Sequence, residues 1–414
     1  MTGAPLLEIR RSRVAVTAAY AAQGLGYAVV VTSLPSFTGR LGIDDVAVSL
    51  IVLLVCVTAA GGSVVADLLA RWRGSRAALA AGLIVQAAAF VGIAVAPPLP
   101  IFVAAFGVYG LGLGAVDASA AMQGVLVQRR YGRDIMGAFF AAYTAAAIGG
   151  ALLVAGSAAA LGDAVFSGGV AMGPALALGA AAVVAVAVAA NGTRAFDRAR
   201  AAAPVGERPR IPLPRRGIWL FGFVILAAFT LDSGVSTWST IYLNDDLASG
   251  AAIAPLGYAA YQVAILVTRL TTDRATGRWG RTVVVVTATS VSIVGLVLVA
   301  ALPWTIAAIV GFALAGVAVG ALVPLSFTSA GALAPTRGDE VIARVNLFNY
   351  AGAVLGAVLL GLLADAPGLG IAFLLPALLL VSILFLARRF GRAVAASEPS
   401  VGTSVFADGA DPSR

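Results

Sequence analysis

The sequence of 414 residues contains no histidine, no lysine and only one cysteine, Cys56. Without histidine the chain has no His-based metal site, no imidazole proton relay and no Ser–His or Cys–His catalytic pair. One cysteine excludes an intramolecular disulfide, and its place in an apolar run predicts a buried thiol that packs as a small hydrophobic side chain. We therefore expect no enzyme activity, no metal site and no cofactor.

Charge is also scarce. Only 11% of the residues are charged, 60% are hydrophobic and the mean hydropathy is +0.99, whereas soluble domains have about 25% charged residues. Most of the chain must therefore lie in lipid, where a spanning helix needs about 20 apolar residues. The apolar runs predict an all-helical membrane protein with twelve spans, at 14–37, 46–70, 77–97, 101–127, 135–161, 170–190, 217–243, 253–272, 282–302, 305–333, 341–364 and 368–387.

The charges that are present follow a pattern. The net charge is +8, but the arginines lie in alternate connections, which indicates membrane orientation rather than nucleic-acid binding. One arginine, Arg40, lies on the opposite side, together with acidic residues such as Asp44, Asp45 and Asp163. We expect both termini on the cytoplasmic side of a bacterial inner membrane and an even number of spans.

The segments between the apolar runs divide the chain. Residues 1–13 form a cytoplasmic N-terminus, and the first apolar run is too long for a cleaved signal peptide, so it is predicted to remain as a helix. Residues 191–216 are rich in arginine and proline and predict a flexible cytoplasmic linker between a six-helix domain at 14–190 and a second at 217–387. The tail at 388–414 is predicted to be disordered.

The two predicted domains resemble each other at a fixed offset of 206 residues. The matching pairs include an aspartate, a proline and several glycines, namely Asp67 and Asp273, Gly74 and Gly280, Pro97 and Pro303, Gly110 and Gly316, Gly114 and Gly320, Gly132 and Gly338, and Gly150 and Gly356. Parallel repeats of this kind are a known transporter construction, with substrate sites near the membrane midplane.

Two carboxylates, Asp117 and Asp232, lie well inside predicted spans. A charged side chain at mid-bilayer costs about 2.5–3.5 kcal/mol on insertion scales, so it usually faces a cavity or a partner. A carboxylate in such a position is a candidate to take up and release a proton or to bind a substrate. The alternative is that each Asp is hydrogen-bonded to neighbouring helices and serves packing.

With twelve spans, a basic central linker and a repeated short loop, the chain resembles the major facilitator superfamily of transporters. The loop reads GSVVADLLARWRGSR at Gly62–Arg76 and RLTTDRATGRWGR at Arg269–Arg281. The resemblance implies a pair of six-helix domains that expose a substrate site to each side of the membrane in turn. It also implies a conformational latch at the cytoplasmic helix ends, formed by Asp67, Arg71, Arg73, Asp273, Arg274 and Arg278. Short charged turns that only set orientation are the alternative.

Finer motifs resemble the fucose-permease-like branch of this family and its uncharacterised bacterial relatives. They are GLGLGAVD at Gly110–Asp117, GRDIMGAFF at Gly132–Phe140, DSGVSTWS at Asp232–Ser239 and GYAAY at Gly257–Tyr261. Three positions depart from that branch, where this chain has Ala121, Phe140 and Thr237.

Polar and aromatic side chains within the spans are candidates to line a central cavity, because aromatic rings stack on ligands and amides hydrogen-bond them. They are Gln23, Tyr27, Gln123, Tyr143, Thr144, Trp238, Tyr261, Gln262, Asn346 and Asn349. Each of them is individually also typical of helix packing or of an interfacial anchor.

We expect a secondary transporter that moves a small organic molecule, coupled to protons, because the chain has no nucleotide-binding loop. The aromatic candidates and the departures from the sugar-associated positions favour export. Uptake of a sugar or another metabolite remains the alternative, and a transport-inactive membrane sensor or scaffold is an alternative of a different class. A monomer is expected from the resemblance.

Overall fold

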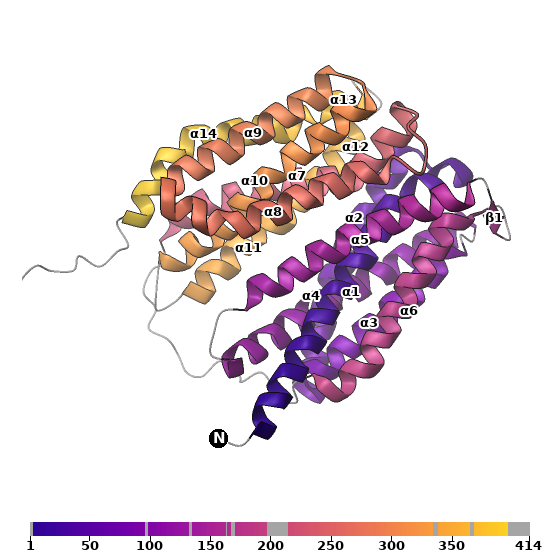
Figure 1. Ribbon diagram of the computed structural model, residues 1–414, viewed down its shortest axis with the longest axis horizontal. Coiled ribbons are helices and arrows are strands. Elements are labelled where there is room, and N and C mark those ends of the chain that lie inside the picture. Colours follow the sequence, from indigo (N-terminus) through magenta and orange to yellow (C-terminus); the bar gives the residue numbers. More distant parts are fainter. Residues whose placement is uncertain are drawn as a thin grey trace, which may run out of the picture.

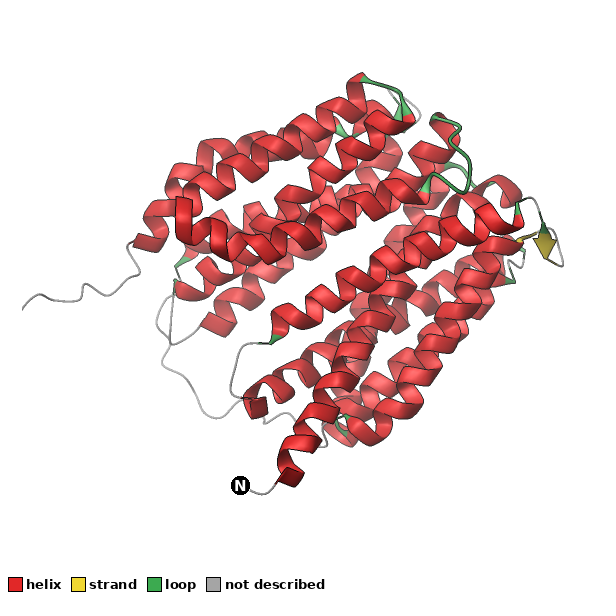
Figure 2. Ribbon diagram, in the orientation of Figure 1, coloured by secondary structure: helices red, strands yellow, loops and turns green. Residues whose placement is uncertain are grey.

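The computed structural model describes residues 3–95, 98–131, 135–162, 164–166, 170–196, 214–333, 338–364 and 368–395, which are almost entirely helical (Figure 2). The first seven helices are α1 (Gly3–Leu41), α2 (Asp45–Arg73), α3 (Ser75–Ala94), α4 (Leu99–Tyr131), α5 (Met136–Leu161), α6 (Met172–Ala195) and α7 (Arg215–Ile241). The remainder are η1 (Tyr242–Asp246), α8 (Pro255–Trp279), α9 (Arg281–Ala301), α10 (Thr305–Ala332), α11 (Gly338–Val354), η3 (Leu355–Leu359), α12 (Leu360–Leu362), α13 (Leu369–Ala372) and α14 (Leu374–Ala395).

The helices correspond to the twelve predicted spans, with some differences. Ten helices in the described residues are long and apolar enough to cross a membrane, and Leu347–Leu362 is a shorter apolar helix. The one remaining predicted span corresponds to α8. The last three turns of α8 carry charged residues, which lower the mean hydropathy of the helix. The first helix begins at Gly3, well before the apolar run at 14–37, because a helix continues beyond the bilayer into the charged N-terminal segment. Two short strands that pair antiparallel were not predicted, namely β1 (Val165–Phe166) and β2 (Val170–Ala171).

Local sequence signals set several helix ends. The side chain of Asp44 accepts a hydrogen bond of 2.7 Å from the backbone N–H of Ala47 and caps the start of α2. Gly74 ends α2 and begins α3 with φ +88°, and Gly280 joins α8 to α9 with φ +81°. Both angles lie in the region that favours glycine. The two glycines are partners in the predicted repeat, so the repeat extends to backbone conformation.

The contact between α2 and α4 in the first half of the chain is repeated between α8 and α10 in the second half. A Cβ atom added at Gly114 on α4 would collide with the carbonyl oxygen of Ala59 on α2, and one added at Gly320 on α10 would come within 3 Å of the carbonyl oxygen of Ile265 on α8. Ile265 stands 206 positions after Ala59, and Gly320 stands 206 positions after Gly114. Glycine lets these backbones approach because no side chain separates them.

The helices form two groups that lie side by side, α1 to α6 and α7 to α14 (Figure 1). Between the groups α5 packs against α8, α2 packs against η3 and α12, and α1 packs against α7. The predicted domain boundaries remain a prediction, because the linker residues 197–213 and tail residues 396–414 lie outside the described residues.

The groups are closely packed at the end of the molecule that is poor in arginine. Ser49 of α2 lies against Gly361 of α12, which leaves no room for a Cβ atom there. Nearby, Val154 of α5 and Pro255 of α8 border a gap of only about 10 Å³, which is barely the space of one water molecule. This end is therefore closed.

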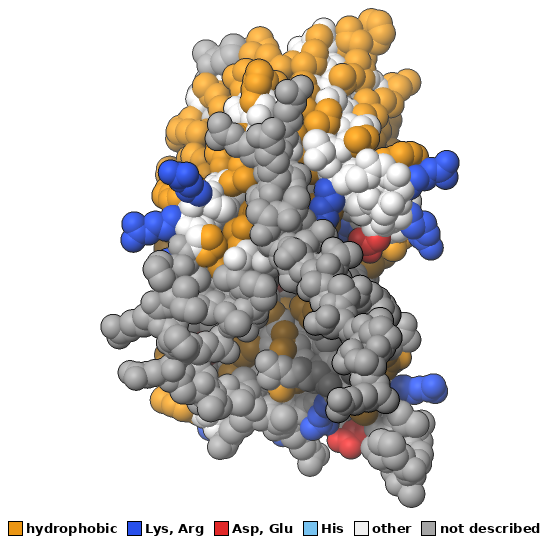
Figure 3. Space-filling view, turned by 90° about the vertical axis from the view of Figure 1, so that its left-hand side faces the viewer, with side chains coloured by type: hydrophobic (Ala, Val, Ile, Leu, Met, Phe, Trp, Pro, Cys, Tyr) orange, Lys and Arg blue, Asp and Glu red, His pale blue; other side chains and the backbone are white. Residues whose placement is uncertain are grey.

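The opposite end carries the arginines. Figure 3 views the molecule from the side on which the N-terminal helix begins, and arginine side chains surround that end. Arg10, Arg73, Arg215 and Arg278 are among the exposed arginines of the helix ends there. We call it the arginine-rich end, and the positive-inside rule predicts that it faces the cytoplasm.

The close approach of α2 and α4 leads to a stability prediction. Gly114→Val is expected to destabilise the protein by about 1–3 kcal/mol, because the added side chain must push the two backbones apart. The measurement is the melting temperature of the purified protein in detergent.

The matched control is Gly149→Ala on α5, where nothing lies within 4 Å of an added Cβ atom. This control should melt at the wild-type temperature or slightly above it, since alanine favours the helix. Equal melting temperatures for the wild type and Gly114→Val would contradict the assigned helix contact.

Candidate functional site

Asp117 lies in the middle part of α4, and its side chain is exposed although the helix is surrounded by others. Its Oδ1 accepts a hydrogen bond of 2.8 Å from Nε2 of Gln23, a buried residue on α1. The same Nε2 donates to the carbonyl oxygen of Leu113 at 3.3 Å. Gln23 thus fixes the orientation of the carboxylate while leaving its other side accessible.

The accessible side of Asp117 continues along α4. Ala121 and Val125, one and two helical turns further on, are also exposed, and residues four apart lie on the same face of a helix. These turns lead toward the arginine-rich end. Asp117 therefore belongs to an exposed face of α4 that continues toward the arginine-rich end.

Asp232, on α7 in the second group of helices, has a different environment. Its Oδ1 accepts a hydrogen bond of 2.8 Å from the hydroxyl of Tyr261 on α8. Two turns further along the same face of α8, the guanidinium of Arg269 interacts electrostatically with this carboxylate. Asp232 therefore has both a hydrogen-bond donor and a compensating cation, whereas Asp117 has a neutral amide donor.

Arg269 also connects the two groups of helices. Its Nη1 donates a hydrogen bond of 3.0 Å to Oγ1 of Thr144 on α5. The sequence motif assigned Arg269 to a cytoplasmic loop pattern and gave it no role in a site. The predicted span at 253–272 already contains Arg269, and a charged side chain within a span is the signal that could have made it a site candidate.

Tyr27 lies between the two carboxylates. It is close enough to interact electrostatically with both Asp117 and Asp232, and it shares a hydrogen bond with Ser236 on α7. Since Tyr27 is on α1 and Ser236 is on α7, this hydrogen bond links the two groups of helices. A side chain on the first helix thus connects the two acidic positions that the sequence singled out.

Further tyrosines surround this point. Together with Tyr27 they form what we call the tyrosine cluster, whose members come from α1, α4, α5 and α8 and interact electrostatically with one another or with the carboxylates: Tyr27, Tyr109, Tyr143, Tyr258 and Tyr261. The hydroxyl of Tyr109 is buried and has no hydrogen-bond partner among the described residues. Tyr109 and Tyr258 were not among the predicted cavity residues. Tyr258 precedes Tyr261 by one turn, so the helical spacing of this pair on α8 could have indicated it.

The other predicted cavity residues differ in their burial and in their hydrogen-bond partners. Thr144 and Gln262 are buried, and Gln262 Nε2 donates to the hydroxyl of Tyr258 beside the cluster. Gln123 is fully buried and donates to Oγ of Ser75 at 2.8 Å, in a contact between α4 and α3. Asn349 is half-buried on α11, and the side chain of Asn346 lies outside the described residues.

Trp238 lies in a packing contact. It is fully buried, and its Nε1 donates a hydrogen bond of 2.8 Å to the carbonyl oxygen of Ala357. Ala357 belongs to η3, a π-helical turn between α11 and α12, and such turns interrupt the regular α-helical hydrogen bonds. The indole N–H therefore provides a hydrogen bond to a backbone carbonyl at a place where the regular hydrogen bonding of the helix is interrupted.

The predicted latch residues lie at the arginine-rich ends of α2 and α8. Asp67 and Arg71 form an ion pair of 2.6 Å within α2, and both side chains are well exposed, so the pair contributes little to stability. Asp273, Arg274 and Arg278 are exposed on α8. Within the described residues, the ion pair of Asp67 and the hydrogen bond of Arg274 each stay on one helix, and a latch remains a prediction.

The environment of Trp238 allows a test that separates packing from ligand binding. Trp238→Phe should lower the free energy of unfolding by about 1–3 kcal/mol, because it removes the donor to a buried carbonyl. The melting temperature in detergent reports this loss. The shift that a bound ligand adds to the melting temperature should stay unchanged, and a loss of that shift without loss of stability would instead put the indole in the ligand site.

Comparisons with known proteins agree with the fold. The family model of the Major Facilitator Superfamily matches residues 2–155 and 218–406. The chain is 26% identical over 391 residues to an uncharacterized MFS-type transporter of Yersinia pestis, covering 92% of this chain and 96% of the relative.

Solved structures extend the comparison. A mutant of the nucleoside transporter NupG superposes with a TM-score of 0.71 at 14% identity, covering 92% of this chain and 99% of that one. A bacterial homolog to the human lysosomal transporter Spinster superposes with a TM-score of 0.68 at 13% identity, covering 95% and 99%. These likenesses show a shared fold. Since the family model matches most of its length, the chain belongs to the major facilitator superfamily and is a membrane transporter, not an enzyme.

Proposed function

We propose that this transporter exports a small organic molecule in exchange for protons, and that Asp117 is the group at which proton and substrate compete. The observation that carries the proposal is the environment of Asp117. This carboxylate is exposed at mid-span, and within the described residues it accepts a hydrogen bond from the neutral amide of Gln23. It can therefore gain or lose a proton without breaking an ion pair.

The contrast with Asp232 supports this choice. Protonating Asp232 would leave the guanidinium of Arg269 without its compensating charge, and an unpaired charge inside a membrane protein is costly. Asp232 therefore acts as a permanent partner for Arg269 and Tyr261. Its role is to position the α7–α8 side of the site.

A single accessible carboxylate favours exchange over cotransport. When a proton occupies Asp117 the site has lost its negative charge, and when Asp117 is ionised it can bind a hydrogen-bond donor or a cationic group of a substrate. Binding of one partner then opposes binding of the other. Because the cytoplasmic side is normally the less acidic, this competition favours loading of the substrate there and its displacement by protons on the other side.

The tyrosine cluster suggests the substrate's shape. Tyrosine rings provide apolar faces that pack against flat or hydrophobic groups, and their hydroxyls provide hydrogen bonds at the edge. Tyr27 and Tyr143 are half-buried, while Tyr258 and Tyr261 are fully buried. A partly apolar, amphipathic organic molecule fits these properties better than a sugar, which needs many polar partners.

The test uses everted membrane vesicles that contain the full chain and are energised to an acidic interior. Compounds from a panel of amphipathic drugs and sugars are added, and proton release is followed with a pH-sensitive fluorescent dye. We expect an amphipathic compound to cause proton efflux. Asp117→Asn should abolish this efflux, because the exchange needs a carboxylate, yet exchange of labelled for unlabelled substrate should remain measurable.

Asp245→Asn is the matched control, because Asp245 is an exposed carboxylate near the closed end whose hydrogen-bond partner is its neighbour Asn244. This variant should behave as the wild type. Asp232→Asn should instead reduce the amount of folded protein, since it leaves Arg269 uncompensated. Proton efflux that persists in Asp117→Asn would contradict the role of Asp117, and proton uptake driven by a sugar would favour a symporter.

A further inference from the structure

A groove on the outside of the molecule, between α1 and α6, has the properties of a lipid site. The groove has a volume of about 580 Å³, which lies in the usual range of ligand pockets, about 300–1,000 Å³. It lies at the arginine-rich end, and α1 and α6, which line it, pack side by side in the lower part of Figure 1. It is separate from the central site that Asp117 and the tyrosine cluster form.

Each helix contributes one face to the groove. From α1 come Arg11, Val14, Ala15 and Ala18, at the spacing of three and four residues that lines up one side of a helix. Ala15 and Ala18 are too small to fill the space, and Val14 is 68% exposed. This part of α1 therefore presents an apolar surface to the bilayer that no described side chain covers.

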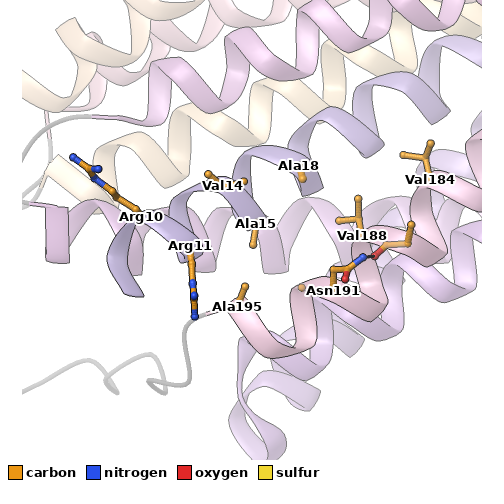
Figure 4. Close-up of a pocket in the computed structure, with 11 residues that line it drawn as sticks. Arg10, Arg11, Val14, Ala15, Ala18, Val184, Val188, Asn191 and Ala195 are labelled. Carbon is orange, nitrogen blue, oxygen red and sulfur yellow. Dashed lines mark hydrogen bonds between the residues drawn. The ribbon is translucent and has the colours of Figure 1, made fainter. Parts of the chain in front are cut away.

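The α6 face follows the same spacing, with Val184, Ala187, Val188, Asn191 and Ala195. A hydrogen bond joins the two helices beside Arg11. Oγ of Ser12 on α1 donates it, over 2.7 Å, to the carbonyl oxygen of Ala195 at the end of α6. Figure 4 shows the α1 and α6 side chains on the two sides of the space. Because the lining is apolar, its occupant must offer hydrocarbon.

The charge at the end of the groove narrows the choice of occupant. Arg10 and Arg11 lie there, both side chains are exposed, and Figure 4 shows them pointing to different sides of α1. No acidic side chain pairs with either of them among the described residues. Two cations beside an apolar groove at membrane-surface level match a lipid with an anionic headgroup, and basic pockets between spanning helices are known to bind such headgroups.

We propose that the α1–α6 groove binds an anionic phospholipid from the leaflet at the arginine-rich end. One acyl chain lies between Val14, Ala18 and Val188, and the phosphate lies beside Arg11, with Arg10 adding positive charge at the same end of the groove. Since α1 also carries Gln23 and Tyr27, a lipid in this groove supports the helix that holds the proposed proton site. The binding itself does not depend on the proposed transport function.

The experiment titrates the delipidated full-length protein in detergent with either phosphatidylglycerol or phosphatidylcholine and follows its melting temperature. A ligand that binds the folded state raises the melting temperature according to its affinity and concentration. Phosphatidylglycerol should stabilise the protein more than phosphatidylcholine does. In the double variant Arg10→Gln/Arg11→Gln the apparent affinity for phosphatidylglycerol should fall roughly 30-fold, since each arginine contributes attraction to an anionic lipid.

Arg215→Gln/Arg216→Gln is the matched control, because it removes two exposed arginines at the start of α7, away from the groove. This control should keep the preference for phosphatidylglycerol. Ala187→Trp, which fills the groove with a bulky ring at an exposed position, should weaken phosphatidylglycerol binding while the two arginines remain.

Three results would overturn the proposal. One is an equal response to the two lipids, and another is an equal loss in the two double arginine variants, which would indicate a general effect of charge. The third is stabilisation of the same size by inorganic phosphate alone, which would identify a free-anion site instead of a lipid site.

Discussion

Hydrocarbon offers no hydrogen bonds, so a polar group inside a span is stabilised mainly by partners within the protein. This constraint explains the arrangement of the interior. The amide of Gln23 donates to Asp117, the hydroxyl of Tyr261 donates to Asp232, and the indole of Trp238 donates to a carbonyl in a π-helical turn. Because each partner lies on a different helix, the polar groups also determine which helices meet.

The same constraint distinguishes the two carboxylates. Asp232 has a hydroxyl donor and a nearby guanidinium, and that guanidinium reaches across to Thr144 in the other group of helices. Asp117 has an amide donor and an open side. A buried, compensated charge is suited to holding a structure together, whereas an accessible one is suited to exchanging a proton. Tyr27 lies near both and hydrogen-bonds across to α7, so a change at one carboxylate can influence how the two groups contact.

Much of the fold was predictable from the sequence because lipid imposes length and composition on every span. The repeat was also predictable, since glycines are needed where backbones approach or where φ is positive, and Gly74 and Gly280 have the same conformation. The strands β1 and β2 and the π-helical turn η3 were not predictable, because hydropathy does not distinguish them from loop and regular helix. The charged end of α8 is a further case, because the predicted span stops at residue 272 whereas the helix continues to Trp279.

The site was only partly predictable. Both acidic positions followed from their cost in a bilayer, but their partners depend on which helix faces lie together, which a single sequence does not contain. Gln23, Tyr27 and Tyr261 were among the candidates, and they lie beside the carboxylates. Gln123 was chosen by the same reasoning and lies in a contact with Ser75. Arg269 was read as part of a loop motif because its helix ends in charged residues.

The central claim is that Asp117 faces a water-accessible space that continues toward the arginine-rich end. The most direct measurement replaces Cys56 with Ser and introduces Asp117→Cys. A membrane-impermeant thiol reagent is then added to oriented vesicles from one side at a time. We expect fast labelling from the arginine-rich side and protection from the other side, where Ser49 and Gly361 close the protein. An absence of labelling from either side in folded protein would show that Asp117 is a packed residue and would contradict the account.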